Sequence, residues 1–106
     1  MRVLLDEQIP VGVTDLLVGP IVRTVVGMGW SGVRNGDLLQ RIAGQFDAFV
    51  TMDRNLEFQQ NLAALSFGIV LLRAPSNRLA DLAPLAPAIL AALPAVRPGQ
   101  VTRIGS

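Results

Sequence analysis

Short runs of apolar residues, without the polar alternation of a half-exposed strand, constrain this chain more than any other feature. They cover residues 3–5, 48–50 and 69–72. Such runs are typical of strands buried on both faces, which is how parallel sheets are built. The first run leads directly into Asp6, and the second leads through Thr51 and Met52 into Asp53. Because ligands bind outside the carboxyl ends of parallel strands, we expect both aspartates at the same edge of the sheet.

Turn and cap signals divide the rest of the chain into alternating elements. Pro10 suits the start of a helix, and Asn35 is a good N-cap for the next one. Pro84 and Pro87 fall at the start of the last helix, where amide donors are unpaired. The predicted strands cover 2–5, 21–26, 47–52, 69–72 and 101–104, and the predicted helices cover 10–18, 36–44, 56–63 and 84–93.

This alternation predicts an α/β fold with a mainly parallel sheet of four to five strands, in a single domain over residues 1–106. A strand begins within two residues of the N-terminus, which leaves no signal peptide and favours a cytoplasmic location. The apolar stretch 79–96 is too short and too broken by proline to span a membrane. We expect it to be a covering helix. The apolar share of 51% further predicts that part of the surface meets another subunit or a partner.

Several residue types are missing, and their absence excludes several chemistries. The chain has no Cys, His, Tyr or Lys; nine Arg and eight Asp or Glu give it a net charge of +1. Disulfides, thiolate or imidazole metal sites, a P-loop and a Schiff-base lysine are therefore excluded. The small net charge argues against a strongly basic nucleic-acid binder. Catalysis must rely on carboxylates, guanidinium groups and a hard divalent cation that carboxylates can hold.

Three aspartates are the candidate catalytic and metal-binding residues. Asp6 and Asp53 end strands, and Asp37 opens the helix that lies between them in the sequence. We expect all three at one edge, where each pair of like charges at roughly 4 Å costs about 4 kcal/mol at a surface-like dielectric. Mg²⁺ or Mn²⁺ reverses the sign of that energy. Such an ion lowers the pKa of a bound water and stabilises phosphate charge, which predicts phosphodiester hydrolysis.

Each acid also has a purely structural interpretation. Asp6 can cap the following helix or bind a loop, and Asp53 can be the N-cap of the 56–63 helix. Asp37 in a first helical turn is favoured by the helix dipole alone. Glu7 and Glu57 are interpreted as solvated side chains rather than site residues.

Side chains suited to a nucleic acid lie beside these acids. Arg54 and Asn55 follow Asp53, and Arg34 precedes Asp37; arginine binds phosphate in bidentate fashion. The alternative for each arginine is a surface salt bridge. Gln59 belongs to an amide-rich stretch that either contacts a nucleic acid or forms a solvated helix face. Trp30 can stack on a base but is more typical of a core or interface residue.

Three blocks of sequence together resemble the compact bacterial PIN-like proteins. They are LLDEQIP at 4–10, GMGWSGVRNGDLL at 27–39 and VTMDRNLEFQQNL at 50–62. Relatives of that family include the toxins of VapBC-type toxin–antitoxin pairs. The resemblance implies a three-layer PIN-like fold and a Mg²⁺- or Mn²⁺-dependent ribonuclease site formed by Asp6, Asp37 and Asp53. The family often has a further acid where this chain has Asn55, which puts a second metal in doubt.

The leading hypothesis is therefore a metal-dependent endoribonuclease that cuts RNA, as the toxin of a toxin–antitoxin pair. Arg54, Asn55, Arg34 and Gln59 are its predicted substrate-binding residues. An antitoxin protein and a second copy of the chain, in a homodimer, are its expected partners. The main alternative is a non-catalytic PIN-like module that binds RNA or a protein. A phosphoacceptor receiver also fits strand-ending aspartates, but it requires a lysine that the chain lacks.

Overall fold

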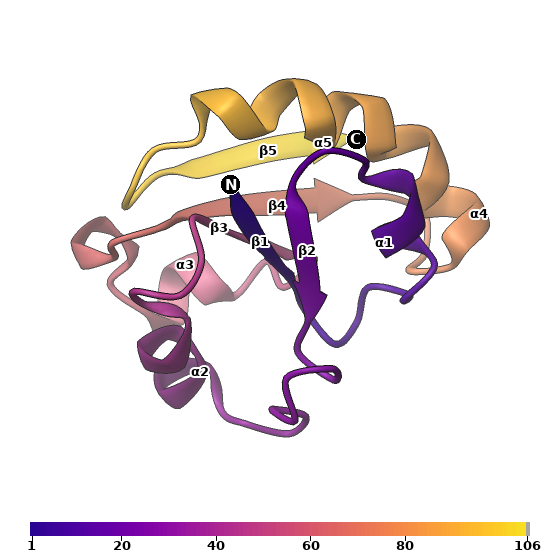
Figure 1. Cartoon of the computed structure of the whole chain (residues 1–106). Coiled ribbons are helices and arrows are strands. Elements are labelled where there is room, and N and C mark those ends of the chain that lie inside the picture. The colour runs from indigo at the N-terminus through magenta and orange to yellow at the C-terminus, as the bar shows by residue number, and fades with distance from the viewer. Residues whose placement is uncertain (106) are drawn as a thin grey trace.

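The computed structural model describes residues 1–105 and is centred on a five-stranded sheet in the order β2-β1-β3-β4-β5 (Figure 1). Every neighbouring pair of strands is parallel. The α/β class and the parallel sheet predicted from the sequence are confirmed. The strands are β1 (Arg2–Leu5), β2 (Ile21–Thr24), β3 (Ala48–Thr51), β4 (Gly68–Arg73) and β5 (Val101–Gly105).

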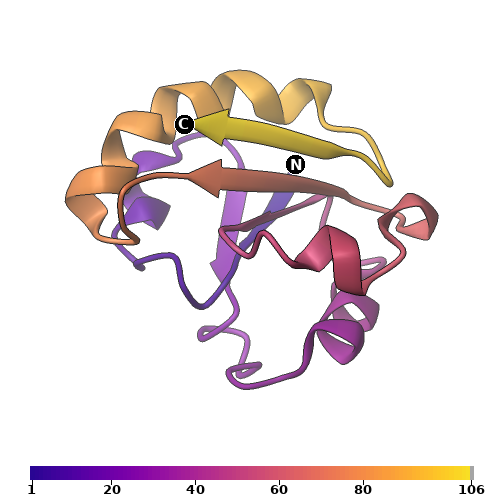
Figure 2. The same ribbon diagram turned by 180° about the vertical axis from the view of Figure 1, so that it is seen from behind.

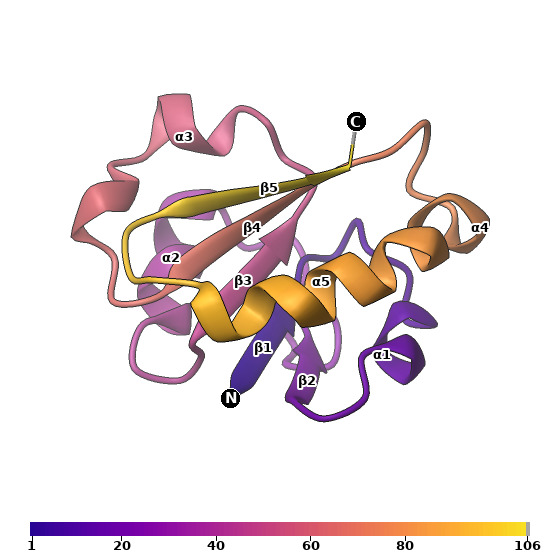
Figure 3. The same ribbon diagram turned by 90° about the horizontal axis from the view of Figure 1, so that it is seen from above.

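Helices cover both faces of the sheet, so the architecture has three layers. Figures 2 and 3 show α5 lying along one face, with α2 and α3 on the opposite side. The α-helices are α1 (Val13–Leu16), α2 (Asn35–Ile42), α3 (Leu56–Gln59), α4 (Leu79–Leu82) and α5 (Ala86–Ala92). The 3₁₀ helices are η1 (Leu62–Ala64), η2 (Ala83–Leu85) and η3 (Leu93–Ala95).

The central strands bury side chains on both faces, and this explains their unbroken apolar character. Val3 and Leu5 of β1 belong to the core beneath α1, α4 and α5. Leu4, between them, belongs to the second core beneath α2 and α3. All three side chains have no exposed surface. A polar residue on either face of β1 would therefore leave an unpaired polar group in a core.

The sheet topology places the two strand-ending aspartates beside each other. From β1 the chain crosses to β2 at one edge, and it then returns to β3 on the other side of β1. The carboxyl edge between β1 and β3 is thus the point where the strand order reverses, which is where open α/β sheets bind ligands. Leu5 pairs with Val50, so Asp6 and Asp53 emerge at this point.

The last helical region is longer and more segmented than the predicted helix 84–93. It runs from 79 to 95 as α4, η2, α5 and η3, and a proline lies at the first or second position of each of the last three segments. A proline has no N–H and breaks the helical hydrogen-bond ladder, so each one starts a new segment. No helix within residues 1–105 has both the length and the apolar character required to cross a membrane.

Two other helices are shorter than predicted. Of the predicted 10–18, only α1 is α-helical, because Gly12 and the β-branched Val11 and Val18 have low helix propensity. The predicted 56–63 is interrupted at Gln60, whose backbone is extended, between α3 and η1. Helix α2 ends at Ile42 rather than 44 because Gly44, at φ +80°, adopts the left-handed conformation that terminates helices.

Candidate functional site

Asp6 lies directly after β1 and is the one charged side chain among the buried polar residues of the described chain. Its main-chain N–H donates to the Val50 carbonyl at 2.9 Å, which continues the pairing with β3 and fixes the residue at the sheet edge. Two donors hold its carboxylate. The Thr51 hydroxyl donates to Oδ2 at 2.6 Å, and the Glu7 N–H donates to Oδ1 at 2.8 Å. The side chain is therefore held in one orientation.

Asp53 lies two residues beyond β3 and is also held through both oxygens. The Asn35 side-chain amide donates to Oδ2 at 3.0 Å, and the Asn55 N–H donates to Oδ1 at 3.0 Å. The second of these bonds is an Asx-turn that leads into α3. Asp53 is therefore a turn residue before α3 and not its N-cap, the alternative considered from the sequence, because Asn55 holds that position. Its other oxygen connects the end of β3 to the start of α2.

Thr51 links the two acids, and the sequence interpretation did not identify it. Its side chain is fully buried at the end of β3. The hydroxyl donates to Asp6 and accepts the main-chain N–H of Asp53 at 3.0 Å. A hydroxyl in an otherwise apolar buried strand, two residues before an acid, was the available signal, since buried polar groups require partners.

Burial raises the pKa of the Asp6 carboxyl above its usual range. The loss of hydration is the largest cause; the hydrogen bonds from Thr51 and Glu7 lower the pKa, and the negative charges of Glu7 and Asp53 raise it. The geometry agrees, because the Thr51 hydroxyl contacts both the Asp6 carboxylate and the main-chain N–H of Asp53. No cationic side chain compensates them, because Arg103–Glu57 is the ion pair formed within residues 1–105.

Asp37 does not join these two acids. It is exposed in the first turn of α2, and within the described residues no three Asp or Glu side chains form a group able to hold a metal ion. The reason is local: α2 begins at Asn35, so Asn35 faces Asp53 and Asp37 lies further around the turn. The expected convergence of three carboxylates is thus a neighbouring pair in the structure, and a metal role for each acid stays a prediction.

Glu7 and Glu57 were interpreted as solvated side chains, and in the structure each has a partner within the chain. Glu7 is exposed and accepts the Gly32 N–H at 3.3 Å, which ties the 27–34 loop to the end of β1. Glu57 of α3 forms an ion pair with Arg103 of β5. Glu7 nevertheless contributes negative charge near Asp6.

The predicted substrate-binding residues surround the Asp53 side of the site. Arg54 and Asn55 are exposed immediately after Asp53. Arg34 is the N-cap residue of α2, and Asn35, predicted as that cap, is the first helical residue instead. The Asn35 amide binds Asp53 and not the helix terminus, and it also donates to the Gln59 side-chain oxygen at 3.5 Å. Trp30 packs edge-to-face against Phe46, as expected for a core residue.

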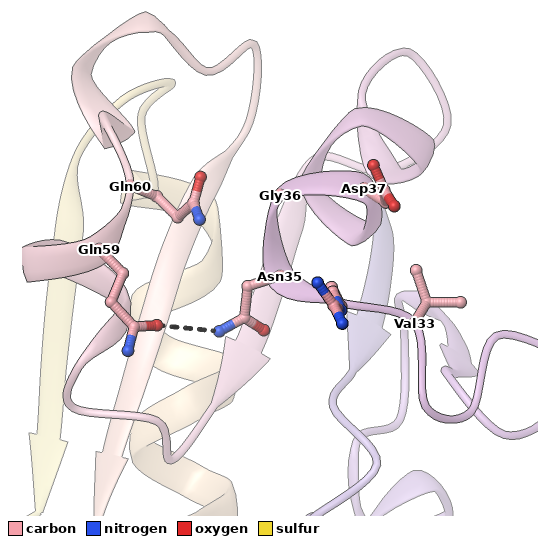
Figure 4. A pocket seen from close by; sticks show the side chains of 7 residues that line it. Val33, Asn35, Gly36, Asp37, Gln59 and Gln60 are labelled. Carbon is pink, nitrogen blue, oxygen red and sulfur yellow. Dashed lines mark hydrogen bonds between the residues drawn. The ribbon is translucent and has the colours of Figure 1, made fainter.

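One pocket is lined by Asp6, and another is lined by Asn35, the residue that binds Asp53. A polar pocket of about 690 Å³ extends beyond Asn35 and is lined by Arg34, Gly36 and Gln59, among others (Figure 4). Asp6 borders the other, a mostly apolar pocket of about 430 Å³ that includes Ile9. The two pockets differ in polarity, and each is reached from one of the two acids directly or through Asn35.

The two acids have the donor chemistry of a hard-cation site. Two carboxylates with about four acceptor positions each use two hydrogen bonds apiece, so acceptor capacity remains on both. Mg²⁺ is commonly held by one or two carboxylates together with waters, and neighbouring donors that fix the ligands are typical of such sites. Asp6 and Asp53 are thus sufficient in kind and number to hold one ion.

No family model, curated protein or solved structure matches this chain, so its resemblance to PIN-like proteins stays a prediction.

Proposed function

We propose that this protein is a Mg²⁺- or Mn²⁺-dependent ribonuclease whose site is centred on Asp6 and Asp53. One observation carries the proposal: a buried carboxylate lies beside a second acid at the reversal point of the sheet, and neither of them forms an ion pair within residues 1–105. Burying a charge next to a like charge is unfavourable unless a counter-charge is supplied. A divalent cation is the counter-charge that carboxylates select. The PIN-like resemblance of the three sequence blocks agrees with this chemistry.

In this proposal each side chain has a defined task. Asp6 and Asp53 would hold the ion, which when bound supplies an acidic water and a positive charge beside the phosphate. Thr51 and Asn35 are positioning residues. The buried Thr51 hydroxyl holds the Asp6 carboxylate, and the Asn35 amide holds the Asp53 carboxylate. Arg54 and Arg34 are exposed and form no ion pair within residues 1–105, so they are available to bind phosphate. Asp37 would act from further away, through water.

RNA cleavage tests the proposal directly. Purified protein is incubated with a mixture of single-stranded and structured RNAs in Mn²⁺, in Mg²⁺ and in EDTA. We expect cleavage that requires the cation and falls at least about 100-fold in Asp6→Asn and in Asp53→Asn. Asp15→Asn changes an exposed acid of α1 and is the matched control. An Asp6→Asn protein that cuts as well as the wild type would show that the proposal is wrong.

A non-catalytic module that binds RNA or protein is the second candidate. It is favoured by the absence of a third carboxylate from the Asp6–Asp53 pair within the described residues. Calorimetric titration with Mn²⁺ separates the two candidates. Binding that is lost in Asp53→Asn supports the nuclease, whereas heat changes that are the same in both proteins support the non-catalytic module.

Partners are proposed from the exposed apolar side chains. Val11, Val18 and Val26 lie near the β2 edge and are 75%, 79% and 61% exposed. Such residues are consistent with a homodimer or with an antitoxin covering this part of the surface. Light scattering at micromolar concentration is expected to give twice the monomer mass. A monomer that also fails to co-purify with the product of an adjacent small gene would contradict both partnerships.

A further inference from the structure

The polar pocket beside Asp53 is lined by side-chain amides from two separate elements. Asn35 and Gly36 come from the first turn of α2, and Gln59 and Gln60 come from the end of α3. Figure 4 shows the two glutamines on one side of this space, facing Asn35 and Gly36 on the other. The Asp37 carboxylate is drawn on the far side of the helical turn. The side of the pocket near the glutamines therefore presents carboxamides, and Arg34 and Asp37 add charged side chains to the rest of the lining.

These amides have unused hydrogen-bonding capacity. Asn35 donates to Asp53 and to the Gln59 oxygen, which leaves the Gln59 NH₂ group free to donate. Gln60 is half-buried as a residue, and its side-chain amide takes part in none of the side-chain hydrogen bonds formed within residues 1–105. Its polar atoms stay accessible to water, so a ligand can bind them without breaking a hydrogen bond within the chain. Donor and acceptor atoms thus remain side by side in the pocket.

Gly36 keeps this wall open. It lies inside α2 and is not among the glycines with positive φ, so the backbone does not require glycine there. Glycine at a helical position is less favourable than alanine. A Cβ at this position would lie 3.8 Å from both polar atoms of the Gln60 amide. An alanine Cβ would thus make an ordinary contact with that amide and take up part of the space in front of it.

We propose that this pocket binds a nucleobase of single-stranded RNA, with a preference for adenine. The inference rests on the proposed ribonuclease function and names the base that the site reads. A carboxamide pairs with adenine through one donor and one acceptor, at N7 and the N6 amino group. Single-stranded RNA presents such base edges without unpairing a helix. Because Asn35 both binds Asp53 and lines the pocket, the bound base would lie on the Asp53 side of the site.

Nucleotide binding in EDTA tests the base pocket without cation or cleavage. ¹⁵N-labelled protein is titrated with adenosine 5′-monophosphate, uridine 5′-monophosphate and ribose 5-phosphate, and the side-chain NH₂ signals are followed by NMR. We expect the adenine nucleotide to shift the signals of Asn35, Gln59 and Gln60 and to bind about tenfold more tightly than the uracil nucleotide. Ribose 5-phosphate, which lacks a base, is expected to leave these signals in place. Equal affinity for all three probes would overturn the proposal.

Two variants separate the pocket from the fold. Gln60→Ala is expected to weaken adenosine 5′-monophosphate about tenfold, whereas Gln100→Ala, an exposed amide before β5, is expected to change nothing. Gly36→Ala is expected to weaken this nucleotide while raising the melting temperature, a combination that a merely structural role does not produce. Unchanged affinity in both pocket variants would refute the base pocket. A wild-type protein that binds adenosine 5′-monophosphate in this way but cleaves no RNA would instead refute the ribonuclease and leave the base pocket standing.

Discussion

Asp6 is central to the proposed site, and its ionised form also lowers the stability of the fold. Its raised pKa means that the folded chain keeps the Asp6 proton to a higher pH than the unfolded chain does. Below about pH 3.9 both states are protonated. Above that, the unfolded chain loses the proton first, so Asp6 weakens the fold progressively until the pH passes the raised folded pKa. Ionised Asp6 therefore destabilises the cation-free protein at neutral pH.

We accordingly expect Asp6→Asn to be more stable than the wild type at pH 7 in EDTA. The difference between the two free energies of unfolding should grow as the pH rises from about 3.9 and level off above the folded pKa. Urea unfolding at a series of pH values measures it. Asp15→Asn, at an exposed position, should run parallel to the wild type. A constant difference between Asp6→Asn and the wild type across the whole pH range would contradict this account.

Thr51 offers a second test at the same scale. Thr51→Val keeps the shape of the side chain and removes the hydroxyl that donates to Asp6 and accepts from Asp53. Two buried polar groups then lose a partner, at about 1–3 kcal/mol each. Thr51→Ser keeps the hydroxyl and loses about 0.8 kcal/mol with the methyl group. Thr51→Val is therefore expected to unfold at clearly lower urea concentration than Thr51→Ser. The reverse order would mean that the hydroxyl does not hold the acids.

At the scale of elements, the start of α2 is attached to the end of β3 through one side chain. Asn35→Ala removes the bond to Asp53, and because the acceptor is charged we expect a loss of about 1.5 kcal/mol in the free energy of unfolding. Asn61→Ala, at an exposed asparagine between α3 and η1, is the matched control. Chemical denaturation measures both variants. Equal stability of the two would show that the Asn35–Asp53 bond contributes nothing to the attachment of α2.

The elements also show how far the sequence alone could lead. The three central strands were predictable because buried parallel strands need unbroken apolar runs, and this also placed Asp6 and Asp53 at one edge. The edge strands β2 and β5 contain polar residues and were predictable from their β-branched residues instead. Helix lengths were less predictable, since single residues such as Gly44 and Pro87 decide where a segment ends. The position of Asp37 was not predictable, because a rotation of one or two residues around the first turn of α2 decides which side chain faces Asp53.

Residues such as Thr51 and Asn35 are harder still to find from the sequence. Each has an ordinary local explanation, as a β-branched strand residue and as a helix cap, and each acts through a partner that is distant along the chain. The hydrogen bond from Thr51 to Asp6 joins residues 45 positions apart in the sequence, and the bond from Asn35 to Asp53 joins residues 18 positions apart. The periodicity of the sequence carries no information on such pairings.

For the molecule as a whole, one sheet separates two cores, and this predicts how the chain unfolds. Ile89 of α5 is fully buried in one core, while Trp30, the single tryptophan, packs against the other. Neither core is complete without the sheet, so we expect both to be lost in one transition. Ile89→Ala removes buried methyl groups and should cost about 2–5 kcal/mol. The unfolding transitions measured by Trp30 fluorescence and by far-UV circular dichroism should both show this loss in the free energy of unfolding, although Trp30 lies on the opposite face of the sheet.

Phe58→Ala is the control, because its side chain is 85% exposed, and it should leave both transitions unchanged. A Trp30 transition that stays fixed in Ile89→Ala would show that the two sides of the sheet unfold independently.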